Sequence, residues 1–98
     1  RRDIMLRALE ATMPEGTSWT HPEGGFFIWL TLPGELTCAP VAQACLERGV
    51  QVGQGPAFFT AGGGQQNIRL AYSFNDEEEI NRGIAILADV IKEQLASS

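Results

Sequence analysis

Arg69 is the residue of this sequence whose type and position most strongly suggest chemistry. It lies in a run of apolar and small residues, between Ile68 and Leu70. A guanidinium buried in such a strand must find an anion or carry a large desolvation cost. Its planar fork of donors fits a carboxylate, and Ala71 and Ser73 on the same strand face are small enough to leave room for a ligand. An internal ion pair with an Asp or Glu, or simple edge exposure, explains the pattern equally well.

Histidine and cysteine side chains are weaker candidates. His21 stands in a turn with no nucleophile in a recognisable setting, which favours a surface histidine over a general base. Cys45 falls on an apolar helical stripe, as buried and inert thiols do, whereas Cys38 lies near a helix start, where a reactive thiolate is a minor alternative. The two cysteines are seven residues apart in one predicted helix, so we expect no disulfide. No Cys and His cluster has metal-ligand spacing, so we predict no metal site.

Three successive glycines, at residues 62–64, invite comparison with phosphate-binding loops. Such loops follow a strand and open a helix. The glycines here precede a predicted strand, so we interpret them as part of a connecting loop.

The composition describes one small globular domain over residues 1–98. Its 98 residues are 44% hydrophobic and 19% charged, which is enough apolar material for a single core. The formal net charge of −5 repels phosphate backbones and anionic lipid heads, so we expect neither nucleic acid nor a membrane as a partner.

Apolar periodicity and turn residues predict a short series of helices and strands. The predicted elements are a helix over 4–12, strands over 17–19 and 26–32, a helix from 37 or 38 to 48, strands over 50–52 and 67–74, and a helix from 76 towards the last residues. This order predicts an α+β fold in which helices pack on a small mixed or antiparallel sheet. The first helix has no capping residue ahead of it, so we expect the parent chain to continue upstream.

The predicted strand over 26–32 is apolar on both faces. Phe27 and Trp29 point away from the face that carries Ile28 and Leu30. Such a strand needs cover on both sides. We therefore expect the Phe27 side to contact further parts of a longer protein, or to drive self-association of the isolated chain.

A series of short motifs runs from end to end of the chain. They are Arg1-Arg2-Asp3, Met13-Pro14-Glu15-Gly16, Trp19, Pro22-Glu23-Gly24-Gly25-Phe26-Phe27-Ile28-Trp29-Leu30, Leu32-Pro33, Glu47-Arg48-Gly49-Val50, Gly55-Pro56-Ala57-Phe58-Phe59, Gly62-Gly63-Gly64, Asn67-Ile68-Arg69-Leu70 and Glu78-Glu79-Ile80. In this order they resemble the carboxy-terminal small domain of class I/II aminotransferases. The resemblance is strongest to the branch that contains 2-aminoadipate-type transaminases and the aminotransferase-like halves of MocR regulators.

This resemblance implies a pyridoxal-phosphate enzyme of fold type I, in which a large domain holds the cofactor and this small domain closes over the substrate. Arg69 falls on the family position whose guanidinium binds the α-carboxylate of the amino-acid substrate. The resemblance and the residue chemistry thus name the same side chain. Asn67, Phe58 and Gly25 fall in segments that line or border the substrate region. Gln54 departs from the family, which usually has proline there.

The resemblance also implies what this chain lacks. Fold-type I chemistry needs a lysine that forms a Schiff base with pyridoxal 5'-phosphate. The family places that lysine upstream, in the N-terminal large domain, and Lys92 is the only lysine here. We therefore assign no catalytic, cofactor-binding or metal-binding residue to this chain. We expect the chain alone to bind no cofactor and to be inactive.

The predicted function is that of a C-terminal fragment of an aminotransferase, which transfers an amino group between an amino acid and a 2-oxo acid. Its expected partners are that substrate, the missing large domain and a second copy of the parent, which we expect to be a cytoplasmic homodimer. Two alternatives stay open. One is a free-standing module that binds a small molecule or a protein. The other is the effector-sensing half of a MocR-type transcription regulator.

Overall fold

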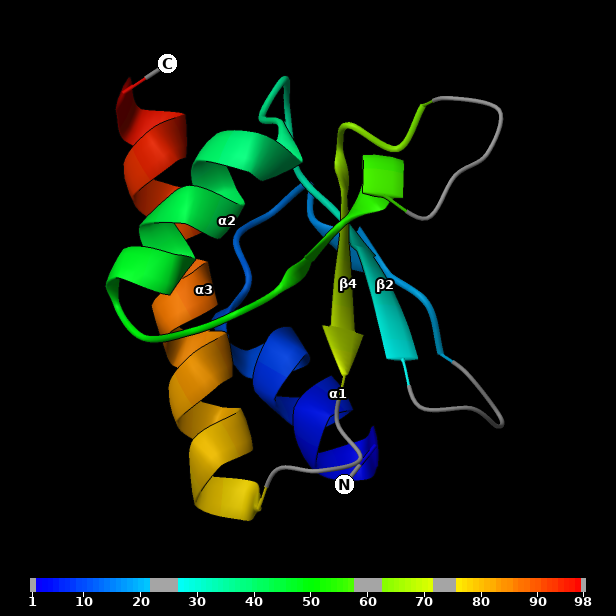
Figure 1. Ribbon diagram of the computed structural model, residues 1–98. Helices are drawn as coiled ribbons and strands as arrows, with labels where there is room; N and C mark the ends of the chain where they lie inside the picture. Colours follow the sequence, from blue (N-terminus) through cyan, green and yellow to red (C-terminus); the bar gives the residue numbers. More distant parts are fainter. Residues whose placement is uncertain (1, 22–26, 58–62, 72–75, 98) are drawn as a thin grey trace.

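The computed structural model describes residues 2–21, 27–57, 63–71 and 76–97 (Figure 1). Its elements are α1 (Arg2–Thr12), β1 (Ser18–Trp19), β2 (Phe27–Thr31), α2 (Cys38–Glu47), β3 (Gly53–Gln54), the 3₁₀ turn η1 (Gly55–Ala57), β4 (Asn67–Ala71) and α3 (Glu77–Ser97). The α+β fold predicted from the sequence is confirmed. None of the described helices is both long and apolar enough to cross a lipid bilayer.

The described strands form one antiparallel sheet in the order β1-β2-β4-β3. Its central pair is β2 with β4, in which Trp29 lies opposite Arg69 and Phe27 lies opposite Ala71. On the other edge of β4, Gly53 of β3 lies opposite Arg69. Of the two predicted sheet types, mixed or antiparallel, the structure therefore has the antiparallel one.

Alternating side chains divide the two central strands between two faces. Ile28 and Leu30 on β2, and Ile68 and Leu70 on β4, are buried. They pack in one cluster with apolar side chains from α1, α2 and α3. Figure 1 shows these three helices on the same side of β2 and β4. The hydrophobic core thus lies between the helices and one face of the sheet.

The last helix begins at Glu77, next to the start that the sequence predicts at residue 76. The backbone N–H of Glu79 donates a hydrogen bond of 2.8 Å to Oδ1 of Asp76, which caps the helix. Glu77, Glu78 and Glu79 occupy the first turn, where the helix dipole stabilises negative charge. The buried stripe of α3 consists of Ile80, Ile84, Leu87, Ala88, Val90 and Ile91. This acidic cluster is part of the helix start.

The strand predicted over 50–52 is wrong, because the sheet pairing falls on Gly53 and Gln54 instead. The N–H of Val50 donates a hydrogen bond of 2.8 Å to the carbonyl oxygen of Cys45 and so closes the end of α2. Val50 and Val52 are partly buried against the core cluster. Their alternation in the sequence results from that packing, and it looks like the alternation of a strand. Of the strand predicted over 67–74, residues 67–71 are confirmed and 72–74 lie outside the described residues.

Gly55 allows the turn after β3 to approach the start of β4 closely. A Cβ atom at Gly55 would overlap the carbonyl oxygen of Gly64 and would lie 3.0 Å from both Cβ and the carbonyl oxygen of Asn67. Backbone atoms cannot move aside as a flexible side chain can. Only glycine fits this position without displacing the segment that carries Asn67.

We predict opposite effects for one substitution at two glycines. Gly55→Ala should lower the free energy of unfolding by about 2 kcal/mol through overpacking. Gly83→Ala is the matched control, because the new methyl group would meet Val50 Cγ1 at an ordinary 3.9 Å. Within α3 it should raise the free energy of unfolding by about 0.5–1 kcal/mol, since alanine favours a helix over glycine. Urea unfolding of the two variants measures both effects, and a Gly55→Ala protein as stable as the wild type would contradict the close approach.

Candidate functional site

The candidate site lies on the sheet face opposite the helices, which we call the open face. Its side chains on the central strands are those that alternate with the buried ones: Phe27, Trp29 and Thr31 on β2, and Asn67, Arg69 and Ala71 on β4. Phe27 and Ala71 are exposed, and the other four are half-buried. The predicted apolar side of the strand over 26–32 and the predicted arginine therefore share one surface.

Arg69 occupies the middle of this open face. Its register partners are Trp29 on β2 and Gly53 on β3. Its guanidinium carbon Cζ lies 4.0 Å from the centre of the Phe27 ring, in a cation–π contact. Because Gly53 has no side chain, the β3 side of Arg69 carries only backbone at that position. The guanidinium thus lies against the Phe27 ring, and the neighbouring position on β3 is a glycine.

The sequence left open whether the Arg69 guanidinium is buried or exposed, and the structure shows it half-buried. The sequence shows a nearly continuous apolar run, which is typical of a strand covered on both faces. In the structure the described helices cover only one face. Arg69 points to the other face, so its charge keeps contact with water.

Asn67 shares the open face with Arg69, two residues away along β4. Its Nδ2 donates a hydrogen bond of 3.1 Å to Oγ1 of Thr31, the residue opposite it on β2. Consecutive residues on one strand face are about 7 Å apart. The structure therefore brings two of the sequence-predicted site residues, Arg69 and Asn67, onto one surface. Phe58 and Gly25, the other two, lie outside the described residues.

A shallow pocket adjoins Asn67 on this surface. It is lined by Ser18, Trp19, Thr20, Trp29, Thr31 and Asn67. The backbone N–H of Trp29 donates a hydrogen bond of 3.0 Å to Oγ1 of Thr20, which fixes the segment after β1 against β2. Hydroxyl groups and an amide beside an aromatic wall can orient a small polar ligand. The sequence did not reveal the hydroxyl residues, because only the strand register brings them beside Asn67.

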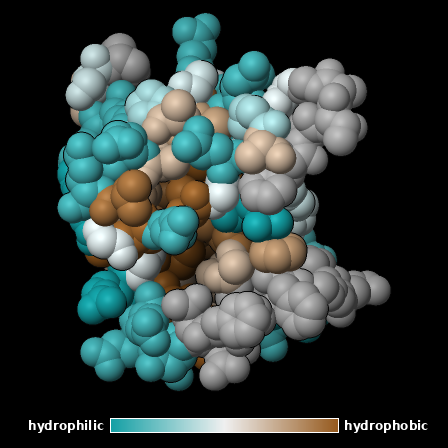
Figure 2. All heavy atoms as spheres, in the orientation of Figure 1, coloured by the Kyte–Doolittle hydropathy of each residue, from teal (hydrophilic) through white to brown (hydrophobic). Residues whose placement is uncertain are grey.

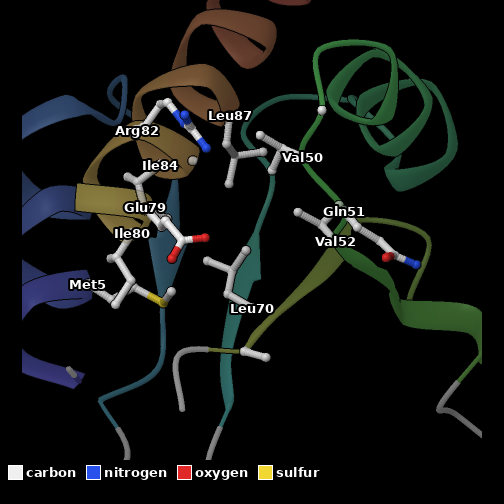
Figure 3. Close-up of a pocket in the computed structure, with 13 residues that line it drawn as sticks. Met5, Val50, Gln51, Val52, Leu70, Glu79, Ile80, Arg82, Ile84 and Leu87 are labelled. Carbon is white, nitrogen blue, oxygen red and sulfur yellow. The ribbon is translucent and has the colours of Figure 1, made fainter. Parts of the chain in front are cut away.

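A separate hollow opens on the helical side, between β4, residues 49–52 and α3 (Figure 3). Most of its lining residues are apolar, among them Val50, Val52 and Leu70, and α3 contributes Glu79 and Arg82. Figure 2 shows hydrophobic atoms gathered between α3 and β4 in this region. Leu70 faces the core side of β4, so the hollow and Arg69 lie on opposite sides of the sheet. Its two charged groups come from one helix and form no recognisable catalytic arrangement.

The remaining candidates from the sequence lie away from the open face. His21 is exposed, and both cysteines are free and buried. Lys92 is exposed on α3, in the helical layer. No group of three or more His, Cys, Asp or Glu side chains that could hold a metal ion occurs within the part of the chain that the structure describes.

Comparison with known proteins gives a consistent match over the whole chain. The profile of the family described as aminotransferase class I and II matches residues 1–87. Aromatic-amino-acid aminotransferase 1 of Thermococcus litoralis is 42% identical over 95 residues, which are 97% of this chain and 23% of that protein. The HTH-type transcriptional regulator YdfD of Bacillus subtilis is 31% identical over 93 residues, which are 95% of this chain and 19% of the regulator.

A solved structure matches the fold closely. The α-aminoadipate aminotransferase LysN of Thermus thermophilus, complexed with N-(5'-phosphopyridoxyl)-L-leucine, has a TM-score of 0.93 and 35% identity to this chain. The match covers 99% of this chain and 25% of LysN. The chain therefore spans about a quarter or less of the length of these proteins.

The buried thiol of Cys45 predicts a loss of stability at alkaline pH. Burial raises the pKa of Cys45 to about 11, and the nearby Arg48 opposes this only in part. The ordinary pKa of cysteine, 9.0, applies to the unfolded state, so above that pH the unfolded state loses a proton that the folded state keeps. The free energy of unfolding should therefore fall as the pH rises from about 9 towards 11, by about 1 kcal/mol at pH 10.

Urea unfolding between neutral pH and pH 10 measures this loss, with Cys45→Ala as the control that removes the titrating group. The variant should lose less stability over that range than the wild type. Equal pH slopes for the two proteins would contradict a buried neutral thiol.

Proposed function

Because this chain belongs to the aminotransferase class I and II family, we propose that it is the substrate-binding part of a pyridoxal-phosphate aminotransferase. In this proposal the parent protein transfers an amino group between an α-amino acid and a 2-oxo acid. Residues 1–98 form its C-terminal small domain, which closes over the active site. Arg69 binds the α-carboxylate of the substrate. The parent is a cytoplasmic homodimer, which rests on the resemblance alone.

The observation that carries the proposal is the place of Arg69 on the open face. The guanidinium is half-buried, lies against the Phe27 ring and has a glycine as its β3 neighbour. Partial burial strengthens an ion pair with a carboxylate, because less water competes for the charge. The planar donors of arginine match the two oxygens of a carboxylate. The surface thus supplies a positioned cation whose neighbour on β3 has no side chain.

The substrate class is supported by what the matched relatives share. LysN was solved with an adduct that joins a phosphopyridoxyl group to leucine, and the Thermococcus litoralis relative is named for aromatic amino acids. These amino acids differ in their side chains and have the α-amino and α-carboxylate groups in common. A carboxylate-binding arginine acts on the common part. Arg69 therefore recognises the class of substrate, and other residues select its side chain.

The described residues do not fit pyridoxal phosphate itself. When bound, this cofactor acts as the electron sink of amino-group transfer, and it needs a lysine that attaches it to the protein. Lys92 is exposed on α3 in the helical layer, whereas Arg69 faces the other side of the sheet. We propose that the cofactor lysine and the cofactor contacts belong to the rest of the parent protein. What this chain contributes is binding and orientation of the substrate.

A second candidate function is supported by the match to the transcriptional regulator YdfD. In that case the parent recognises an amino acid through the same arginine and the binding event alters a DNA-binding part. Carboxylate binding by Arg69 is common to both functions. Turnover of the amino acid separates them.

We predict that Arg69→Ala in the intact protein weakens binding of its amino-acid ligand by about a hundredfold or more, because one partner of a charge pair is lost. Arg69→Lys should recover part of the affinity, since lysine keeps the charge and loses the planar fork. Arg82→Ala, which removes an exposed arginine on α3, is the matched control and should bind normally. Calorimetric titration of the cofactor-loaded protein with a panel of L-amino acids measures these affinities.

Equal ligand affinity in Arg69→Ala and Arg82→Ala would refute the proposed role of Arg69. Absorbance of the bound cofactor should be the same in all three variants, because Arg69 acts on the substrate. Conversion of the bound amino acid to its 2-oxo acid would favour the enzyme, whereas binding without conversion would favour the regulator.

A further inference from the structure

We propose that Phe27 is a positioning residue for Arg69, a role that rests on the proposed binding of the substrate carboxylate by that arginine. The centre of the Phe27 ring lies 4.0 Å from Cζ of Arg69. At this distance the delocalised cation is attracted by the negative face of the ring. The ring thus holds the guanidinium at one place on the open face.

The strand register explains how the ring reaches the arginine. Phe27 lies directly opposite Ala71, and Arg69 lies directly opposite Trp29. Phe27 and Arg69 are therefore diagonal neighbours on one face, a separation that an aromatic ring and a long side chain can bridge. The methyl group of Ala71 leaves the ring room to lean along the strand. A larger residue opposite Phe27 would fill this space.

Stacking on a ring and binding a carboxylate use different parts of the guanidinium. A guanidinium that stacks on a ring uses its flat face, whereas its N–H donors point outward in the plane of the group. A carboxylate approaches in that plane and forms two parallel hydrogen bonds. The contact between the ring and the guanidinium can therefore persist while the substrate is bound.

The contact with the Phe27 ring preorganises the Arg69 side chain for binding. A free arginine side chain populates many rotamers, and binding a ligand must select one of them at an entropic cost. A side chain already held by stacking loses less freedom when the ligand arrives. Exclusion of water by a bound ligand further strengthens the attraction between the cation and the ring.

Phe27 contributes little to the core, which makes its role testable. Its side chain is 39% exposed, and among the described residues the only other exposed large hydrophobic side chain is Leu46. The core cluster contains Ile28 and Leu30 from β2 and does not include Phe27. A change at Phe27 should therefore leave the core of this domain intact.

The test uses the intact, cofactor-loaded protein and the L-amino acid that it binds most tightly in a panel of the standard amino acids and L-2-aminoadipate. Phe27→Leu keeps an apolar side chain and removes the aromatic face, whereas Phe27→Tyr keeps that face. Leu46→Ala, which removes the other exposed large side chain, is the matched control. The same variants are also titrated with the primary amine that corresponds to the chosen amino acid without its carboxylate. Thermal unfolding is recorded for each variant.

Phe27→Leu should raise the dissociation constant of the amino acid about five- to tenfold. Affinity for the amine should be unchanged, and both Phe27→Tyr and Leu46→Ala should stay within about twofold of the wild type. In an Arg69→Ala background Phe27→Leu should have no further effect, because the ring then has no guanidinium to position.

Each of the following results would overturn the inference. Unchanged amino-acid affinity in Phe27→Leu, with weakened affinity in Arg69→Ala, would leave the proposed function standing and remove Phe27 from it. Equal losses for amino acid and amine, or a loss that persists in the Arg69→Ala background, would assign Phe27 a merely structural role. Unweakened binding in Arg69→Ala itself would refute the carboxylate-binding proposal on which the positioning role of Phe27 depends.

Discussion

The antiparallel pairing of β2 with β4 determines which side chains enter the core and which lie on the open face. It aligns two strands so that the apolar residues of each, Ile28 and Leu30 with Ile68 and Leu70, fall on one face. All three described helices pack against that face. A shift of the register by one residue would turn every one of these side chains to the other side. The core therefore fixes the register, and the register fixes what the opposite face presents.

The strand pairing also determines which side chains lie on the open face. Once the core residues are placed, the alternate positions of both strands must point away from the helices. Those positions carry Arg69 and Asn67 on β4 and the aromatic side chains on β2. The contact of Arg69 with Phe27 and the hydrogen bond of Asn67 with Thr31 are both cross-strand contacts of this pair. The packing that stabilises the domain thus also brings together the groups that we propose for substrate binding.

Sequence patterns predicted most of the fold, because the signals involved are local. Helix α3 shows its cap and its apolar stripe in consecutive residues, and strand β4 shows its alternation around Arg69. The strand expected over 50–52 was wrong because packing against the core produced a similar alternation. Placing β3 at Gly53–Gln54 instead of 50–52 requires knowledge of its partner strand, which no local pattern contains.

The candidate site was predicted only in part, for the same reason. Residue chemistry singled out Arg69, and the family resemblance gave it a role and added Asn67. The sequence did not decide how far Arg69 is buried, and the structure leaves it half-buried because the described helices cover one sheet face only. Phe27 was noted as an apolar side chain that needs cover, but its contact with Arg69 depends on a pairing between strands that lie far apart in the sequence.

We propose that the open face binds the substrate carboxylate through Arg69. A crystal structure of the intact protein with a bound L-amino acid would show whether this contact forms. We expect two guanidinium nitrogens of Arg69 at about 2.7–2.9 Å from the two carboxylate oxygens. A carboxylate held by other residues, with Arg69 beyond hydrogen-bond distance, would contradict the claim.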